Sequence, residues 1–139
     1  MLKISHRGNY SGCMPEIENK PEHIKKLLEN NINVEIDVWH INGNFFLGHD
    51  TNQYIIEINF LKNNLLWCHA KNLDAFDKML ENKINCFWHQ NDSYTLTSSG
   101  FIWAYPGVET TDRTIIVDLE SDWKKKTRKC YGVCVDYLD

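Results

Sequence analysis

Several short apolar runs recur along this chain, and most of them are apolar at nearly every position. A strand with one face in water alternates apolar and polar residues, whereas a strand buried on both faces of a parallel sheet does not. The chain is therefore predicted to fold around a parallel sheet that is covered on both faces. The predicted strands are Leu2–Ser5, Asn33–Val38, Phe45–Leu47, Leu65–Cys68, Ile84–Trp88, Phe101–Tyr105, Thr114–Asp118 and Tyr131–Tyr137.

Amphipathic helices are predicted between these strands. Over Pro21–Glu29 the apolar residues recur at the three- and four-residue spacing that places them on one helical face, and the pattern begins again after Asn72. A third, polar helix is expected over Ser121–Arg128, whereas the turn-rich segment Gln90–Gly100 is expected to form a loop. Strands that alternate with helices indicate an α/β fold with right-handed crossovers.

The length of 139 residues limits the size of this fold. It suits one domain with its own core, but an eight-fold α/β barrel takes on the order of 200 residues or more. We therefore expect residues 1–139 to form a single α/β domain, a compact TIM-barrel-like barrel with helices missing or shortened. Missing helices would leave apolar sheet surface open, so a homodimer is an expectation as well.

Charge and composition argue against several classes of partner. The 15 Lys and Arg residues against 19 Asp and Glu give a net charge of -4, and nucleic-acid partners usually require a basic face. No apolar stretch approaches the roughly 18 residues of a membrane-spanning helix, and no signal-peptide pattern is found. The five cysteines are odd in number and scattered, unlike a disulfide framework, so a cytoplasmic location is expected.

Polar residues stand at the carboxyl ends of most predicted strands, among them His6, His49, His69 and His89. In an α/β barrel these ends meet on one face, and active sites are built on that face. Imidazole titrates near neutral pH, which suits it to proton transfer. His6 and His49 are therefore candidates for a general acid-base pair.

Two acidic residues lie within one predicted strand, in the segment Glu35-x-Asp37. Side chains at i and i+2 of a strand point to the same side, so the two carboxylates are predicted to lie together. A hard divalent cation between them would relieve both their mutual repulsion and the cost of burying them. The alternative is a structural ion pair of one carboxylate with Arg7 or Lys71.

The segment His69-x-Lys71 has the same spacing on another strand. His69 is a candidate metal ligand or a residue that orients substrate, and the alternative is a hydrogen-bonded core histidine. Lys71 is a candidate to neutralise a phosphate oxygen. The segments Trp88-His89-Gln90 and Trp103-Ala104-Tyr105 are expected either to line a headgroup pocket, with cation–π contact to choline, or to fill the barrel with their tryptophans.

The order of the polar motifs along the chain carries a family resemblance. The segments are His6-Arg7-Gly8, Pro15-Glu16, Glu18-Asn19, Glu35-x-Asp37-Val38, Leu47-Gly48-His49-Asp50, Lys71 and Gly132-Val133-Cys134-Val135-Asp136. In this order they resemble the glycerophosphodiester phosphodiesterases and, more broadly, the phospholipase-C-like phosphodiesterase barrels. The resemblance is dense over the first half of the chain and returns only at its end, and its specificity lies in the combination of motifs.

The resemblance implies a role for each matching residue. His6 and His49 would be the acid-base pair, Glu35 and Asp37 metal ligands, and Arg7 and Lys71 contacts to the phosphate. Where the family usually places a third acidic ligand this chain has His69, which shifts the metal preference from calcium towards magnesium, manganese or zinc. The family's Pro-Glu-Asn-Thr motif is split, so that either Glu16 or Glu18 could take the place of its glutamate.

These expectations describe an enzyme of lipid metabolism: a metal-dependent hydrolase of small phosphodiesters, namely glycerophosphodiesters or related lysophospholipids, that uses two histidines for acid-base catalysis. A divalent ion is the expected cofactor, with magnesium favoured and manganese, calcium or zinc as alternatives. The nucleophile would be water or a neighbouring substrate hydroxyl, the latter giving a cyclic phosphate. The alternatives are a degenerate barrel that binds a phosphorylated ligand without turnover, and a phosphatase or nuclease-like hydrolase with the same metal site.

Overall fold

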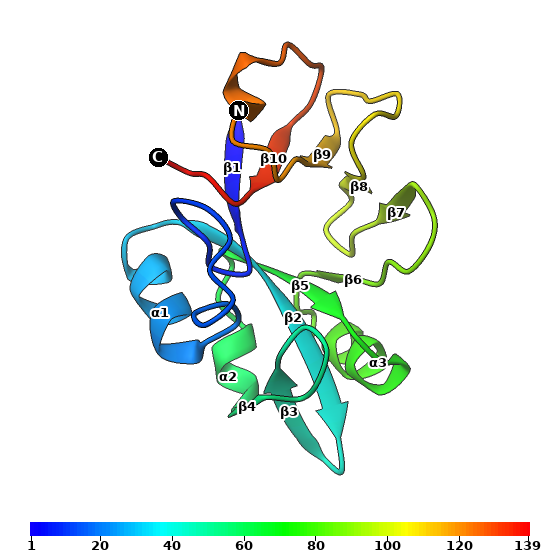
Figure 1. The fold of residues 1–139 in the computed structure, drawn as a ribbon. Coiled ribbons are helices and arrows are strands. Elements are labelled where there is room, and N and C mark those ends of the chain that lie inside the picture. The colour runs from blue at the N-terminus through cyan, green and yellow to red at the C-terminus, as the bar shows by residue number, and fades with distance from the viewer.

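A single curled sheet forms most of the molecule, which the computed structural model describes over residues 1–139 (Figure 1). The sheet has 10 strands, and only short helices pack against it. The strands are β1 (Leu2–His6), β2 (Asn33–Ile41), β3 (Asn44–Leu47), β4 (Tyr54–Ile56), β5 (Leu66–Ala70), β6 (Cys86–Phe87), β7 (Tyr94–Leu96), β8 (Ile102–Ala104), β9 (Thr114–Val117) and β10 (Gly132–Val135). The helices are α1 (Pro21–Glu29), α2 (Ile58–Leu61), α3 (Leu73–Glu81) and the 3₁₀-helix η1 (Trp123–Lys125).

Parallel pairing runs through the centre of the sheet in the order β6–β5–β2–β1–β10–β9–β8, which confirms the predicted parallel arrangement. Strands β3, β4 and β7 are antiparallel additions. The parallel strands share one carboxyl edge, and their register pairs His6 with Glu35 and Asp37 with His69. Residues that are far apart in the sequence therefore meet at this edge.

The expectation of a TIM-barrel-like barrel is wrong. The molecule is a curled half-barrel made mostly of sheet, and its longest helices, α1 and α3, have 9 residues each. The helix expected over Ser121–Arg128 is reduced to η1, because Trp123 is the one apolar residue there and no apolar stripe is available to bury a longer helix. None of the helices combines the length and the apolar character that crossing a membrane requires.

The helices predicted over Pro21–Glu29 and after Asn72 are confirmed as α1 and α3. The side chain of Asn72 accepts a hydrogen bond of 3.0 Å from the Ala75 N–H and so caps the first turn of α3. The loop expected over Gln90–Gly100 instead contains β7, which forms an antiparallel hairpin with β8. Strand β4 and helix α2 occupy a stretch in which no element was predicted.

A tight hairpin between β2 and β3 returns the chain to the carboxyl edge. Its two turn residues, Asn42 and Gly43, have φ values of 51° and 79°, as a turn that matches the twist of the strands requires. After β3, the Gly48 N–H donates to the Asp37 carbonyl at 3.1 Å. A Cβ at Gly48 would lie 2.0 Å from the Thr51 carbonyl oxygen, so only glycine allows the sharp bend that precedes the next residue, His49.

The core lies on both faces of the sheet. Outside, β2 and β5 pack against α1 and α3 through aliphatic side chains such as Ile24, Ile36 and Met79. Inside the curl, Trp67 and Trp103 are buried, which agrees with the expectation that tryptophans fill the interior. The apolar cluster inside the curl consists of Ile4, Trp67, Phe87, Trp103, Ile115, Val117 and Cys134.

Candidate functional site

The carboxyl edge of the sheet opens into a pocket of about 530 Å³. Side chains two positions apart on a strand point to the same face of the sheet. On that face Ile4 and Trp67 fill the interior, and His6 and His69, two positions later at the strand ends, line the pocket. The candidate residues of the sequence meet here. His6, Arg7, Glu35, His49, His69 and Lys71 line the pocket, and Asp37 lies buried in contact with Arg7 and His69.

Glu35, Asp37 and His69 form the one cluster whose spacing could hold a metal ion, because one ligand atom from each lies within 4.8 Å of the others. The nearest distances are 3.4 Å from His69 Nδ1 to Asp37 Oδ1 and 3.9 Å from His69 Nδ1 to Glu35 Oε1. Both carboxylates are buried, yet Glu35 Oε2 and Asp37 Oδ1 have no hydrogen-bond partner. Unpartnered anionic oxygens beside an imidazole nitrogen fit a divalent cation, so the residues present suit the ion that the motifs imply.

The ring of His69 is oriented by contacts on its far side. Its Nε2–H donates to the His89 carbonyl at 3.0 Å, and the ring stacks on Phe87 with centroids 5.0 Å apart. Donation from Nε2 leaves the lone pair of the neutral ring on Nδ1, which is the atom that faces the two carboxylates. This is the arrangement by which proteins prepare a histidine as a metal ligand.

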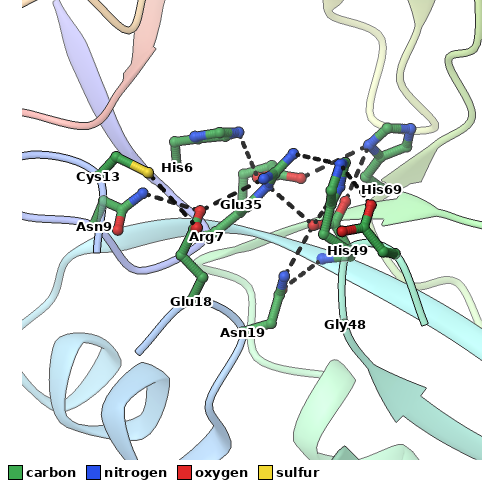
Figure 2. Close-up of polar contacts among 12 residues, drawn as sticks. His6, Arg7, Asn9, Cys13, Glu18, Asn19, Glu35, Gly48, His49 and His69 are labelled. Carbon is green, nitrogen blue, oxygen red and sulfur yellow. Dashed lines mark hydrogen bonds and ion pairs between the residues drawn. The ribbon is translucent and has the colours of Figure 1, made fainter. Parts of the chain in front are cut away.

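The second oxygen of Asp37 is held by hydrogen bonds and an ion pair (Figure 2). Asn19 Nδ2 donates to Asp37 Oδ2, and Asn19 Oδ1 accepts from the Asp37 N–H, both at 2.9 Å. Arg7 Nε lies 3.2 Å from the same Oδ2. Asn19 has a φ of 59°, which asparagine tolerates better than most residues. Its role was not predicted, although the Glu-Asn segment of the family motif pointed to it.

The two carboxylates of the pair differ in their affinity for a proton. Burial raises the pKa of Glu35, and the charge of Asp37 raises it further. Burial would also raise the pKa of Asp37, but its contacts with His49, His69 and Arg7 outweigh burial and lower the pKa below its ordinary range. Asp37 is therefore the firmly ionised member of the pair, and Glu35 is the one that takes up a proton.

His6 is held by Asp136, the last residue of the motif Gly132-Val133-Cys134-Val135-Asp136. The Nδ1–H of His6 donates to Asp136 Oδ1 at 2.8 Å, and Asn9 Nδ2 donates to the same oxygen at 2.8 Å. Burial favours the neutral ring, but the hydrogen bond to Asp136 and the charge of Glu35 outweigh it and raise the pKa of His6. With Nδ1 protonated, Nε2 carries the lone pair and lies 3.9 Å from Glu35 Oε2.

His49 lies across the cluster from His6 and is 41% exposed at its side chain. Its Nε2 lies 3.3 Å from Arg7 Nη2, and because arginine only donates, Nε2 is the acceptor. Its Nδ1 faces Asp37 Oδ2 at 3.6 Å. His49 is thus the histidine of the pair that exchanges protons readily with water.

The two cations of the site have different surroundings. Arg7 contacts Asp37, His49 and Glu18, whose Oε2 lies 3.5 Å from Nη1. Burial opposes the charge of Arg7, but the surrounding carboxylates, led by Asp37, raise its pKa. Glu18 lines the pocket, whereas Glu16 is exposed outside it. Lys71 also lines the pocket but forms no ion pair within the protein.

One further histidine lines the pocket. His89 is buried, and both of its ring nitrogens lack a hydrogen-bond partner. Burial and the proximity of His69 lower its pKa, so its ring is uncharged at neutral pH.

No family model, curated protein or solved structure matches the chain, and the family resemblance of its motifs therefore stays a prediction.

Proposed function

We propose that the protein is a metal-dependent phosphodiesterase that acts on small phosphodiesters of the glycerophosphodiester or lysophospholipid class. One observation carries the proposal: a cation-binding cluster, two histidines and two cationic side chains converge on one pocket. Each part alone has an ordinary structural explanation. Together they supply the charge neutralisation and the proton transfers that phosphodiester cleavage needs.

Glu35, Asp37 and His69 would hold the metal ion, because one ligand atom from each lies within 4.8 Å of the others. The ion would neutralise negative charge on the phosphate oxygens. A nitrogen ligand in place of a third carboxylate favours magnesium with extra waters, manganese or zinc over calcium. Magnesium remains the first expectation, and because His69 supplies a nitrogen ligand, manganese and zinc are expected to bind with similar preference.

Lys71 is the side chain best placed to bind the phosphate. It lines the pocket without an ion pair, so its ammonium group can contact an anionic ligand without losing another partner. Arg7 already contacts Glu18, Asp37 and His49. Arg7 would therefore add positive charge to the pocket while mainly fixing the positions of Asp37 and His49.

His6 is suited to accept the proton of the nucleophile, whether that is water or a substrate hydroxyl. Its Nε2 carries a lone pair, and Asp136 stabilises the imidazolium that forms when Nε2 takes up the proton. His49 would give a proton to the leaving alkoxide, and its exposure lets solvent replace that proton. Each positioned transfer contributes roughly 10²- to 10⁴-fold to the rate.

The surroundings of the site are consistent with a small ligand. The net charge of -4 argues against a long nucleic acid, because such a polyanion needs an extended basic surface. The scattered, odd-numbered cysteines support the cytoplasm as its location.

Binding without turnover is the second candidate function. The guanidinium of Arg7 lies 3.3 Å from His49 Nε2, and because arginine only donates, that nitrogen is occupied as a hydrogen-bond acceptor. A histidine whose exposed nitrogen is held in this way would be a poor general acid. The residues would then bind a phosphate ester and leave it intact.

The deciding experiment is turnover of a panel of glycerophosphodiesters, followed by phosphorus NMR with magnesium, manganese, zinc, calcium or EDTA. We expect metal-dependent release of a phosphomonoester or cyclic phosphate that is lost in Glu35→Gln and His6→Asn. Glu16→Gln is the matched control, because this exposed carboxylate lies outside the pocket. Absence of turnover with every metal, in folded protein that still binds a phosphodiester, would instead support binding alone.

A further inference from the structure

The pocket has two walls of different chemistry. The wall built from the ends of β1, β2, β5 and β10, together with the segment between β1 and α1, carries the acids, the lysine and the arginine of the pocket. The other wall comes from the ends of β6, β8 and β9, the strands at the two ends of the parallel part of the sheet (Figure 1). It consists of Trp88, His89, Gln90, Trp103, Tyr105, Val117 and Leu119, and none of these is an acid, a lysine or an arginine.

His89 is the buried polar group of this uncharged wall. Only 6% of its surface is exposed, and neither Nδ1 nor Nε2 has a hydrogen-bond partner. Its ring packs on Tyr105, with centroids 4.4 Å apart, and its carbonyl accepts the hydrogen bond from His69. Tyr105 therefore packs on the ring, and His69 fixes the backbone that carries it, at the edge of the pocket. A buried polar group without a partner costs about 1–3 kcal/mol, and a ligand that pairs with it recovers that cost.

The neutral ring offers one donor and one acceptor, and a hydroxyl group also offers both. A cationic headgroup would find no carboxylate on this wall. Trp103 cannot serve as an aromatic partner for such a cation, because it is buried and stacked on Phe87 at 4.3 Å. The wall thus favours an uncharged, hydroxylated group over choline.

We propose that His89 hydrogen-bonds a hydroxyl of the ester group that lies beyond the phosphate, and that the protein selects phosphodiesters with uncharged, hydroxylated headgroups such as glycerol or inositol. This inference rests on the proposed function for the placement of the phosphate beside Lys71 and the cation-binding cluster. Specificity arises because a headgroup without a hydroxyl leaves the ring nitrogens of His89 unpaired inside the complex.

The test is calorimetric binding of three compounds: glycerophosphoglycerol, glycerophosphoinositol and glycerophosphocholine. It is run with manganese in the His6→Asn background, so that the compounds stay intact during the titration. We expect the two compounds with a hydroxylated headgroup to bind at least about 10-fold more tightly than glycerophosphocholine, whose choline headgroup has no hydroxyl. In His89→Phe, which keeps a ring against Tyr105 but removes both nitrogens, this ratio should fall to about 2-fold or less.

Two further variants keep the test decisive. Tyr105→Phe is the matched control, because it alters the same wall and leaves the His89 nitrogens in place. His89→Gln restores a donor and an acceptor and should recover part of the preference, even if His89→Phe folds poorly. Equal binding of all three compounds, tighter binding of glycerophosphocholine, no binding of any of them, or a preference that persists in His89→Phe would each overturn the proposal.

These outcomes are separable from those of the proposed function. Turnover of the phosphodiester panel without headgroup preference would refute the role of His89 and leave the phosphodiesterase intact. A headgroup preference that depends on His89, in a protein with no turnover under any metal, would leave this binding role intact and refute the enzyme.

Discussion

Replacing Glu35 by glutamine is expected to stabilise the metal-free protein. Glu35 is buried with an unpartnered oxygen, and its cluster places a carboxylate oxygen of Asp37 within 4.8 Å. Two unit charges at that separation repel by about 3–4 kcal/mol at an effective dielectric constant of about 20. Partial compensation by Arg7 and the neighbouring histidines leaves about 2 kcal/mol, which corresponds to a rise in Tm of roughly 6–8 °C for a chain of this length.

The effect should depend on pH in a defined direction. Burial and the charge of Asp37 raise the pKa of Glu35 above its ordinary value of 4.5, so the folded protein holds a proton that the unfolded chain has released. The contribution of protonated Glu35 to the stability of the metal-free protein is therefore lost as the pH rises from 4.5 through the raised pKa. Glu35→Gln removes this loss, so its advantage over the wild type should widen between about pH 5 and about pH 8.

A bound cation should make the wild type melt at a higher temperature than Glu35→Gln, the reverse of the order expected without metal. Manganese or magnesium stabilises only the state that binds it, so it should raise the Tm of the wild type and leave Glu35→Gln nearly unchanged. The measurement is thermal unfolding by circular dichroism at both pH values, in EDTA and with each metal, with Glu16→Gln as the exposed control. If Glu35→Gln melted below the wild type in EDTA at the higher pH, the repulsion argument would be refuted. An equal rise in the Tm of both proteins with metal would refute the ligand role of Glu35.

Two other substitutions test the remaining parts of the site. Asp136→Asn removes the charge that stabilises protonated His6, so the acidic limb of the pH profile of kcat/KM should move to lower pH. The rate should also fall by about 10²-fold or more. An unshifted limb would show that Asp136 does not act through His6. His69→Glu supplies a third carboxylate in place of the nitrogen ligand, so competition with a metal-sensitive dye should show calcium and magnesium gaining affinity relative to zinc. Unchanged relative affinities would mean that His69 is not a metal ligand.

The sequence by itself determined most strands of the sheet and which polar residues stand at their carboxyl ends. Continuous apolar runs indicated strands buried on both faces, and amphipathic spacing located α1 and α3. Because parallel strands share one carboxyl edge, polar residues at the strand ends predicted that His6, Glu35 and His69 would lie together. These inferences needed only local periodicity and the direction of the strands.

The extent of the barrel was not available from local patterns. The apolar runs do not show whether the connections between β8, β9 and β10 form helices, and those segments bury too little apolar surface to do so. The hairpin of β7 and β8 arises where a polar, turn-rich stretch suggested a loop. The expectation of a TIM-barrel-like barrel with missing or shortened helices was wrong because the sheet curls only into a half-barrel, against which only short helices pack.

Only the tertiary structure decided which atoms of the site are free to act. Asp136 reaches His6 across 130 positions of the sequence, and this contact places the lone pair of the ring on Nε2. In His69 the proton lies on Nε2, which donates to the His89 carbonyl, so the lone pair lies on Nδ1 and faces the carboxylates. A histidine in a sequence carries no information about its tautomer, because the tautomer is set by hydrogen-bond partners that the fold alone brings within reach.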